Sequence, residues 1–396
     1  MAFNASQDRF RVEVFHRDFP ARALEAAGAR DRPDIVAGSW LLAAARGGDA
    51  VRGGDAVRGG DDSRGLLRPF DEELHSGALS QDFYESLLEA GTFDGERRLL
   101  PVSFNASLAI FARERAGALS GATTLEIAEM RELGRAFNAR AGNAFTRMGF
   151  SPTWDANFLF ALAELSGARF SDGDPISWDE EALEAALDLA REWISEDNLG
   201  AAASEDFAFR HFTIPPERMA LSGRILFAYM QSSRFFALPD EIRAALGFRA
   251  LALDGRIPLA DDAAFLGLVE GSAAQAAADA FVNWFFSPET QRGLLERKSA
   301  LRQLETSFGV AGGFSALRAV SEQVFPLFYP ELLGAMASGD SFVPPRPLPG
   351  DWGAIKAQVL LPYLRERAES SEPEGGTSAS RLRTRLVDWA RLNRHD

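Results

Sequence analysis

Short apolar runs alternate with amphipathic helical segments through the middle of this chain, and that alternation limits the possible folds more than any other feature. Three runs of six residues, at 225–230, 248–253 and 264–269, are almost entirely apolar. Runs of this length are typical of buried strands and are short for buried helices. Strands that alternate with helices along a chain predict an α/β fold.

Capping chemistry marks the helices between these runs. Three segments have Ser or Thr followed three residues later by Glu or Gln, which is the pattern of a capping box at a helix N-terminus. They predict helices that begin at Thr123, Ser177 and Ser272 and end near Arg140, Asn198 and Phe286. Apolar spacing predicts further helices at 79–90, from Trp352 onward and at 382–389.

The remaining strand patterns lie in the N-terminal third. Alternating apolar residues predict a strand at 10–15, and apolar stretches predict others at 32–37, 98–104 and 108–111. The C-terminal third has few strand patterns. We therefore expect it to pack as helices on one lobe.

Composition excludes several classes of function. The 396 residues carry a net charge of −15, which disfavours nucleic acids and anionic lipids as partners. No apolar run reaches the roughly 18 residues that a membrane helix needs. The absence of cysteine excludes thiol catalysis, disulfides, iron–sulfur clusters and cysteine-ligated zinc.

The sequence holds no recognisable catalytic or metal-binding pattern. Its four histidines are scattered, and the glycine patterns that bind phosphates or dinucleotides are absent. Asp155 with Glu164, or the adjacent Asp261 and Asp262, could supply the acid and base of a glycosidase. Because the chain has 57 acidic residues, we favour solvated surface groups as the interpretation. We expect no enzymatic activity, no metal and no cofactor.

Aromatic residues outside helical patterns are the more informative candidates. They follow strand ends or turns rich in glycine and proline, and α/β folds place ligands at such loops. These residues are Trp40, Trp154, Tyr229, Phe314 and Trp352. A role in core packing is the alternative interpretation for each of them. The tryptophans assigned to packing, because they lie within helical patterns, are Trp178, Trp193, Trp284 and Trp389.

Five stretches of the chain, in this order and spacing, resemble a known family. They are 3–6 with 10–14, the Pro-Asp-Ile-Val of 33–36, 100–105 with 110–111, 217–224, and the helix at 280–291 with its Ser-Pro-Glu and Gln. In these stretches the chain is similar to the extracellular solute-binding proteins of ABC importers, in the sugar-binding group that includes maltose-binding protein. The resemblance extends from Phe3 to about Leu364.

This resemblance implies a type II periplasmic-binding-protein fold. Such a fold has two α/β lobes with mixed sheets flanked by helices, which close on a ligand about a hinge. The N-terminal lobe would comprise 1–107 and 264–312, and the C-terminal lobe 108–263 and 313–396. Family members have a strand ahead of the segment that matches Phe3, and this chain has only two residues there. We therefore expect the first lobe to be the less stable one.

The resemblance also implies a ligand site between the lobes. Aromatic rings cover the apolar faces of a sugar, and amide and carboxylate groups bond its hydroxyls. The residues carried over as ligand-binding are Trp40, Asn105, Trp154, Asp155, Tyr229, Gln231, Phe314 and Trp352. Trp40 and Asn105 would line the side of the first lobe, Phe314 would sit near a crossover, and the others would line the second.

The function that the resemblance implies is the substrate-binding component of an ABC transporter, which captures a carbohydrate or similar polar solute for uptake. It implies a monomer that works with permease subunits in the periplasm or outside the cell, anchored to the membrane as a lipoprotein in its full-length form. The first ten residues have no basic region followed by an apolar one, so we expect the export signal and the anchor to belong to the full-length form. Two alternatives stay open: a glycoside hydrolase-like enzyme and a ligand-sensing receptor domain.

A short tandem repeat falls outside the resemblance. The residues Arg-Gly-Gly-Asp-Ala-Val at 46–51 recur at 52–57 and in part from Arg58. The repeat has no hydrophobic face and its arginines and aspartates balance in charge, so we expect 47–65 to be a mobile surface loop.

Deleting one copy of the repeat, 52–57, should shift the melting temperature by less than about 2 °C, because a loop without packed side chains contributes little to stability. Thermal unfolding followed by circular dichroism measures this shift. A loss of several degrees would mean that the repeat is packed.

Overall fold

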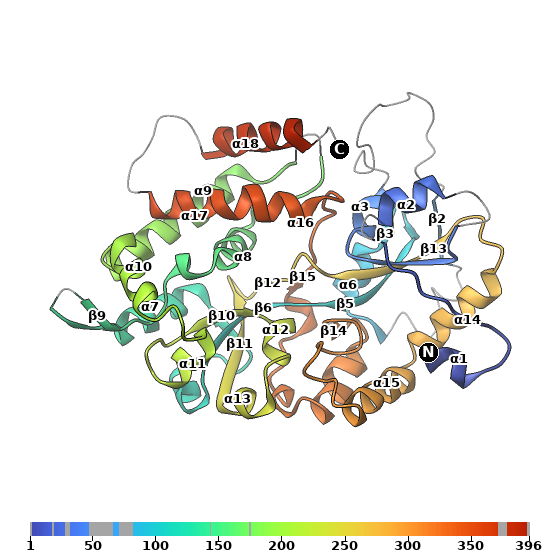
Figure 1. Ribbon diagram of the computed structural model, residues 1–396, viewed down its shortest axis with the longest axis horizontal. Coiled ribbons are helices and arrows are strands. Elements are labelled where there is room, and N and C mark those ends of the chain that lie inside the picture. The colour runs from blue at the N-terminus through green and yellow to red at the C-terminus, as the bar shows by residue number, and fades with distance from the viewer. Residues whose placement is uncertain are drawn as a thin grey trace.

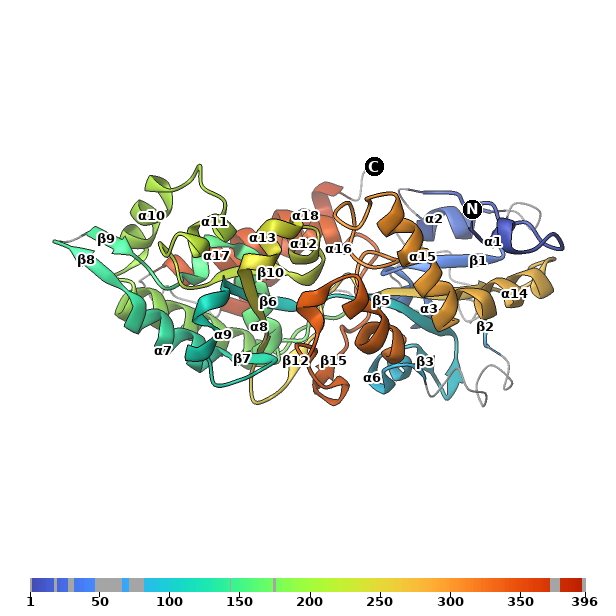
Figure 2. The same ribbon diagram turned by 90° about the horizontal axis from the view of Figure 1, so that it is seen from below.

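The computed structural model describes residues 2–17, 20–27, 32–46, 66–70, 82–142, 144–173, 176–370 and 378–393. The described chain forms two lobes, each with its own sheet, that lie side by side along the longest axis of the molecule (Figure 1). Figure 2 shows the same separation from below. The tandem repeat that we expect to be a surface loop lies outside the described residues.

The sheet of the first lobe has five strands. Its central strand β13 (Ala264–Val269) pairs antiparallel with β1 (Ile35–Gly38), β2 (Leu67–Arg68) and β5 (Leu99–Phe104). Strand β5 also pairs with β14 (Phe314–Ser315). Both β5 and β13 are buried along almost their whole length, which accounts for their mainly apolar sequences. Ser103, the one polar residue in these two strands, donates its hydroxyl to the Ala311 backbone oxygen.

The sheet of the second lobe is mixed, as predicted. Its strand β6 (Ser107–Ala112) pairs antiparallel with β10 (Ala228–Gln231) and β11 (Leu246–Ala252). Strand β7 (Thr124–Glu126) runs parallel to β11. The apolar runs predicted as strands from the sequence therefore supply the central strands of both sheets.

Helices flank both sheets, and short strand pairs complete the lobes (Figure 1). Beside the first sheet lie α1 (Ala2–Ser6), α2 (Pro20–Ala26), α3 (Leu41–Arg46), α6 (Glu85–Ala90), α14 (Gln275–Phe285) and α15 (Pro288–Ala300). Beside the second lie α7 (Ile127–Phe137), α8 (Ala156–Ser166), α9 (Glu180–Glu192), α10 (Ala201–Arg210), α11 (Pro216–Leu221), α12 (Ser232–Phe236), α13 (Asp240–Ala245), α16 (Trp352–Ile355), α17 (Leu361–Glu369) and α18 (Ser378–Asn393). The strand pairs are β3 (Thr92–Phe93) with β4 (Glu96–Arg97), β8 (Ala139–Ala141) with β9 (Ala144–Arg147), and β12 (Ile257–Pro258) with β15 (Phe342–Val343).

Buried apolar side chains form two cores, and the alternation along β6 divides its residues between them. Leu108 and Ile110 belong to the first core, which extends from the first sheet to one face of the second. Ala109 and Phe111 belong to the second core, which lies on the opposite face with α8, α9 and α17. Successive residues of a strand point to opposite faces, so one strand serves both cores.

All three helix starts differ from the capping-box predictions. Helix α14 begins at Gln275, after the N-cap residue Ala274, and not at Ser272. In the other two segments, backbone pairing outweighs the local pattern. The segment expected to open a helix at Thr123 instead supplies β7, and α7 begins after it at Ile127. Ser177 forms two backbone hydrogen bonds with Ser171. Asp179 caps α9 in its place by accepting a hydrogen bond from the backbone N–H of Ala182.

The strand predicted at 10–15 is wrong. These residues have no regular structure, and the side chains of Val14 and Phe15 are exposed. Alternation of apolar residues forms a stable strand only where a neighbouring strand pairs with it, and within the described residues no strand pairs with this segment.

The lobe boundaries given above stay a prediction. Two observations favour moving 313–343 from the second lobe to the first. Strand β14 pairs with β5 of the first sheet, and Leu317, Phe325 and Tyr329 pack in the first core.

Gly149 contacts Gly134 of α7 so closely that a side chain cannot fit between them. A Cβ atom at Gly149 would lie 2.2 Å from the Gly134 Cα. We expect Gly149→Ala to destabilise the protein by about 1–3 kcal/mol, because backbone must move to relieve the clash.

Gly293→Ala is the matched control for this substitution. Gly293 is exposed within α15, and a Cβ atom there would have nothing within 4 Å of it. Alanine there should stabilise by about 0.5–1 kcal/mol through helix propensity. Urea unfolding measures both changes, and equal effects from the two variants would contradict the close contact.

Candidate functional site

Two pockets lie along β10, one within the second lobe and one between the two lobes. One, the aromatic pocket, has a volume of about 280 Å³ and includes Trp154, Phe207 and Tyr229 in its lining. The other, the interlobe pocket, has a volume of about 410 Å³. It is lined from the first lobe by Trp40, which follows β1, and from the second lobe by Trp352 and its neighbours.

The same two elements line both pockets. At the start of α8, Asp155 lines the aromatic pocket and Asn157 the interlobe pocket. On β10, Tyr229 lines the aromatic pocket and Gln231 lines the interlobe pocket. The pockets are therefore neighbouring parts of one binding region along the helix N-terminus and the strand end.

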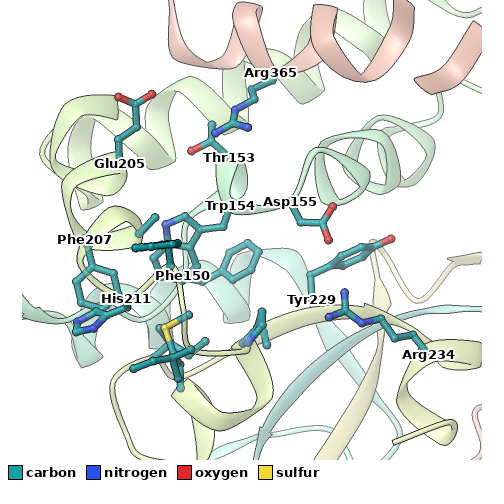
Figure 3. Close-up of a pocket in the computed structure, with 17 residues that line it drawn as sticks. Phe150, Thr153, Trp154, Asp155, Glu205, Phe207, His211, Tyr229, Arg234 and Arg365 are labelled. Carbon is teal, nitrogen blue, oxygen red and sulfur yellow. The ribbon is translucent and has the colours of Figure 1, made fainter. Parts of the chain in front are cut away.

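Flat ring stacking shapes the aromatic pocket (Figure 3). Trp154 stacks on Phe207 with ring centroids 5.7 Å apart and an interplanar angle of 19°, and the edge of Phe150 packs against Trp154 at 5.8 Å. The Trp154 indole N–H donates to the backbone oxygen of Ser204 at 3.4 Å. The indole is thus fixed from two sides while it lines the pocket.

Asp155 and Arg234 bring opposite charges to the aromatic pocket. The Asp155 side chain caps α8, and its Oδ1 accepts from the backbone N–H of Asn157 at 2.9 Å and from the Asn157 Nδ2 at 3.1 Å. The exposed Arg234 guanidinium has no hydrogen bond or ion pair with another described residue. In Figure 3 both charged groups extend toward Tyr229. A polar ligand could use either group.

A hydrogen-bonded ion pair fixes Trp352 in the wall of the interlobe pocket. The Trp352 Nε1 donates to Asp261 Oδ2 at 2.6 Å, and the Lys356 Nζ donates to both Asp261 oxygens at 2.8 and 3.0 Å. The Trp352 ring packs on Phe160 and Phe170 with centroids 6.0 and 5.9 Å away. Because the indole N–H is already bonded to Asp261, Trp352 can contact a ligand only through its ring.

Gly38 allows Trp40 to reach the pocket from the first lobe. A Cβ atom at Gly38 would lie 2.6 Å from the Trp40 indole ring. The missing side chain lets the ring fold back against the end of β1. Glycine is therefore required there for close approach as well as for its φ of 152°.

Burial raises the pKa values of three ionisable groups around these pockets. It raises the pKa of Glu164 to about 7, against the lowering effects of the Phe170 backbone N–H and the charges of Arg169 and Lys356. Burial, with the neighbouring Asp261 charge, also raises the pKa of Asp262. The pKa of Tyr229 is raised by burial as well, so its phenol is neutral at physiological pH.

Asn105 lies in neither pocket. It is 3% exposed and joins segments that cross between the lobes. Its Nδ2 donates to Asp262 Oδ2 and to the Gly312 backbone oxygen, both at 3.0 Å, and its Oδ1 accepts from Ser232 Oγ at 2.8 Å. These bonds use both donors of the side-chain amide and one acceptor position of its oxygen.

The structure thus brings six of the eight sequence-predicted residues to the two pockets. Phe314, like Asn105, lies elsewhere: it is buried in the first core against Phe104 and Phe308. The assignment of all eight to ligand binding stays a prediction. The six residues that line a pocket are Trp40, Trp154, Asp155, Tyr229, Gln231 and Trp352.

Sequence reasoning missed several lining residues. Lys356 follows Trp352 by one helical turn and is one of only two lysines, which could have identified it. Arg234 lies in α12, which begins directly after β10, so it is close to a strand end where ligands bind. Phe207 gave no such signal, because an apolar residue in a helix is most often a core residue.

Neither a metal site nor a membrane span is found in the part of the chain that the structure describes. Within those ranges, no cluster of His, Asp or Glu side chains has the geometry to hold a metal ion. No described helix is long and apolar enough to cross a membrane.

Comparison with solved structures identifies the fold. A cyclo/maltodextrin-binding protein solved with maltotetraose is 14% identical over all of this chain and 92% of its own, with a TM-score of 0.59. The maltose-binding periplasmic protein of Listeria monocytogenes, solved with maltose, is 13% identical over 97% of this chain and 91% of its own, with a TM-score of 0.60. The cyclic α-maltosyl-1,6-maltose-binding protein of Arthrobacter globiformis is 16% identical over 99% and 94%, with a TM-score of 0.60.

No family model and no curated sequence matches the chain. At these identities the similar structures establish the fold alone. The prediction of a two-lobe periplasmic-binding fold is confirmed. The described sheet of the second lobe is mixed, whereas all described strand pairs of the first sheet are antiparallel.

Glu164→Gln should remove a pH dependence of stability. In the wild type the folded carboxyl keeps its proton up to about pH 7, whereas the unfolded one ionises near pH 4.5. The unfolded state therefore binds fewer protons between these values, and wild-type stability falls as pH rises through this window. The variant should gain on the order of 1–3 kcal/mol relative to the wild type between pH 4.5 and pH 8.

Urea unfolding at several pH values measures this gain, with Glu132→Gln as control. Glu132 is exposed on α7. The control should follow the wild type at every pH. A constant difference between Glu164→Gln and the wild type would contradict the raised pKa.

Proposed function

We propose that this protein is the substrate-binding component of an ABC importer and holds a carbohydrate, or a similar polar solute, between its lobes. The observation that carries the proposal is the pair of adjoining pockets, in which aromatic rings from both lobes stand beside polar side chains. The fold supports it as well, because periplasmic-binding folds close on ligands at this interface.

The chemistry of the lining fits a sugar. Trp40 and Trp154 present flat apolar faces that match the C–H faces of a pyranose ring. Asn157 and Gln231 offer amide donors and acceptors, and Asp155 has one carboxylate oxygen outside its capping bonds, so hydroxyls can be paired at low entropic cost. Two of the similar structures were solved with maltotetraose and maltose, which supports this class.

We propose a binding protein and not an enzyme. Neither acid pair named above is arranged for glycosidase chemistry. Asp261 binds Lys356 and Asp262 accepts from Asn105, so both are engaged in structural bonds. Asp155 and Glu164 lie at opposite ends of α8, and Glu164 lines neither pocket. A glycosidase needs one carboxylic acid and one free carboxylate on the two sides of the bond that is cleaved. The similar structures named above are all described as binding proteins.

The roles of two predicted ligand residues are revised in this proposal. Asn105 acts as part of the hinge, because its amide joins crossing segments, and Phe314 acts in core packing. We further propose that the protein works as a monomer, with permease subunits, in the periplasm or outside the cell, with the full-length form anchored to the membrane. The word "periplasmic" in the name of one similar protein supports this location.

Calorimetry with maltose, maltotetraose and mannotriose tests the proposal. Trp40→Ala and Trp154→Ala should each weaken the binding of a sugar that the wild type binds by about tenfold to a hundredfold, because each removes a stacking face worth about 1–3 kcal/mol. The sugar should be recovered uncleaved after incubation. Binding of none of the three sugars, or cleavage of any, would contradict the proposal.

Trp389→Ala is the control for these variants. Trp389 lies on α18, where its Nε1 donates to Gln358, and it lines neither pocket. Its removal should leave sugar affinity unchanged, and an equal loss of affinity in all three variants would show that the effect is not specific to the pockets.

A further inference from the structure

Two phenylalanine rings lie exposed beside the aromatic pocket. Phe209, in the last turn of α10, and Phe212, in the turn that follows, are 75% and 76% exposed. Their rings stack on each other with centroids 5.9 Å apart and an interplanar angle of 19°. We call this pair the outer platform. Neither ring belongs to either core of the described chain.

The outer platform is continuous with the aromatic pocket. Phe212 lines that pocket together with Phe207 and His211 of the same segment. Phe207 stacks on Trp154 at the same 19° angle, and His211 packs its edge against Phe207 at 4.9 Å. Rings therefore extend from the buried wall of the pocket to the solvent-exposed surface, and Figure 3 shows Trp154, Phe207 and His211 beside one another.

Polar groups stand beside the outer platform. Glu205 lines the pocket at the same helix, and Arg210 lies between the two exposed phenylalanines in sequence. The Arg210 guanidinium donates to the Phe145 backbone oxygen at 3.0 Å and pairs with Asp206 at 3.0 Å. A flat apolar surface with fixed polar neighbours is the arrangement that a sugar chain needs on its apolar face and its hydroxyls.

Size favours a slender ligand over a protein partner. Two phenylalanine rings can cover no more than a few hundred Å², whereas a specific protein interface buries about 800 Å² on each partner. The aromatic pocket, at about 280 Å³, also lies at the small end of the roughly 300–1,000 Å³ that ligand pockets enclose. A chain longer than the aromatic pocket must therefore extend beyond it, and Phe212 in the lining marks the side on which it would reach the outer platform.

We propose that the outer platform binds sugar units of a linear oligosaccharide that emerge from the aromatic pocket. The inference rests on the proposed function and deepens it: the ligand is a chain with units both inside and outside the pocket. Phe212 and Phe209 contact successive parts of the emerging chain by stacking, in the order in which they leave the pocket.

The dependence of affinity on chain length tests this inference. Calorimetry compares maltose with maltoheptaose, and mannobiose with mannohexaose, for the wild type and for the double variant Phe209→Ala and Phe212→Ala. In the sugar series that binds, the wild type should prefer the long chain by about tenfold or more. The double variant should lose that preference and keep the wild-type affinity for the short chain.

The control replaces another exposed apolar pair, Leu327→Ala with Leu333→Ala, and should leave both affinities unchanged. The outer-platform rings are exposed, so the double variant should also melt within about 2 °C of the wild type.

Each other outcome is decisive. If no sugar of either series binds, both the proposed function and this inference are wrong. If the wild type binds short and long chains equally, the inference alone is wrong. It is also wrong if the double variant keeps the preference for long chains, or if the double variant binds short and long chains more weakly by the same factor.

Discussion

The arrangement of both lobes depends on the hydrogen bonds where the chain crosses between them. Backbone and side-chain polar groups are buried there, and each needs a partner. Asn105 supplies three of these bonds, and Ser232 extends the network by donating its backbone N–H to the Ala106 oxygen. Asp262, on a second crossing segment, and Gly312, next to β14 of the first lobe, are bonded to the same amide. Movement of one lobe against the other must therefore take place around this network.

A second buried polar cluster sets the shape of the binding region. Asp261 adjoins Asp262 of the crossing network, and it holds both Lys356 and the Trp352 indole. Desolvating this ion pair is costly, and the hydrogen bonds on both carboxylate oxygens compensate for part of the cost. The crossing network and the interlobe pocket thus share adjacent residues, so the geometry of the hinge and the position of a pocket wall are physically linked.

The aromatic side of the region is built differently, by ring packing within one lobe. Trp154, Phe207 and Phe150 contact one another with few hydrogen bonds. Such a wall keeps its shape when the lobes move, because all of its rings belong to the second lobe. We infer a division of roles in which the aromatic pocket is preformed while the interlobe pocket, with Trp40 on the opposite lobe, is completed by closure.

The sequence by itself determined the fold class and the central strands, because a buried strand such as β13 must be apolar along its length whatever surrounds it. Local chemistry also identified six residues that line the pockets, since strand-end loops are where α/β folds expose side chains. Only the tertiary structure decided that the Asn105 amide is hydrogen-bonded at the crossing, that Thr124–Glu126 is a strand and that 10–15 is not one. Each of these features depends on whether a segment distant in sequence pairs with the residues in question. The spacing of residues along the chain does not show which segment that is.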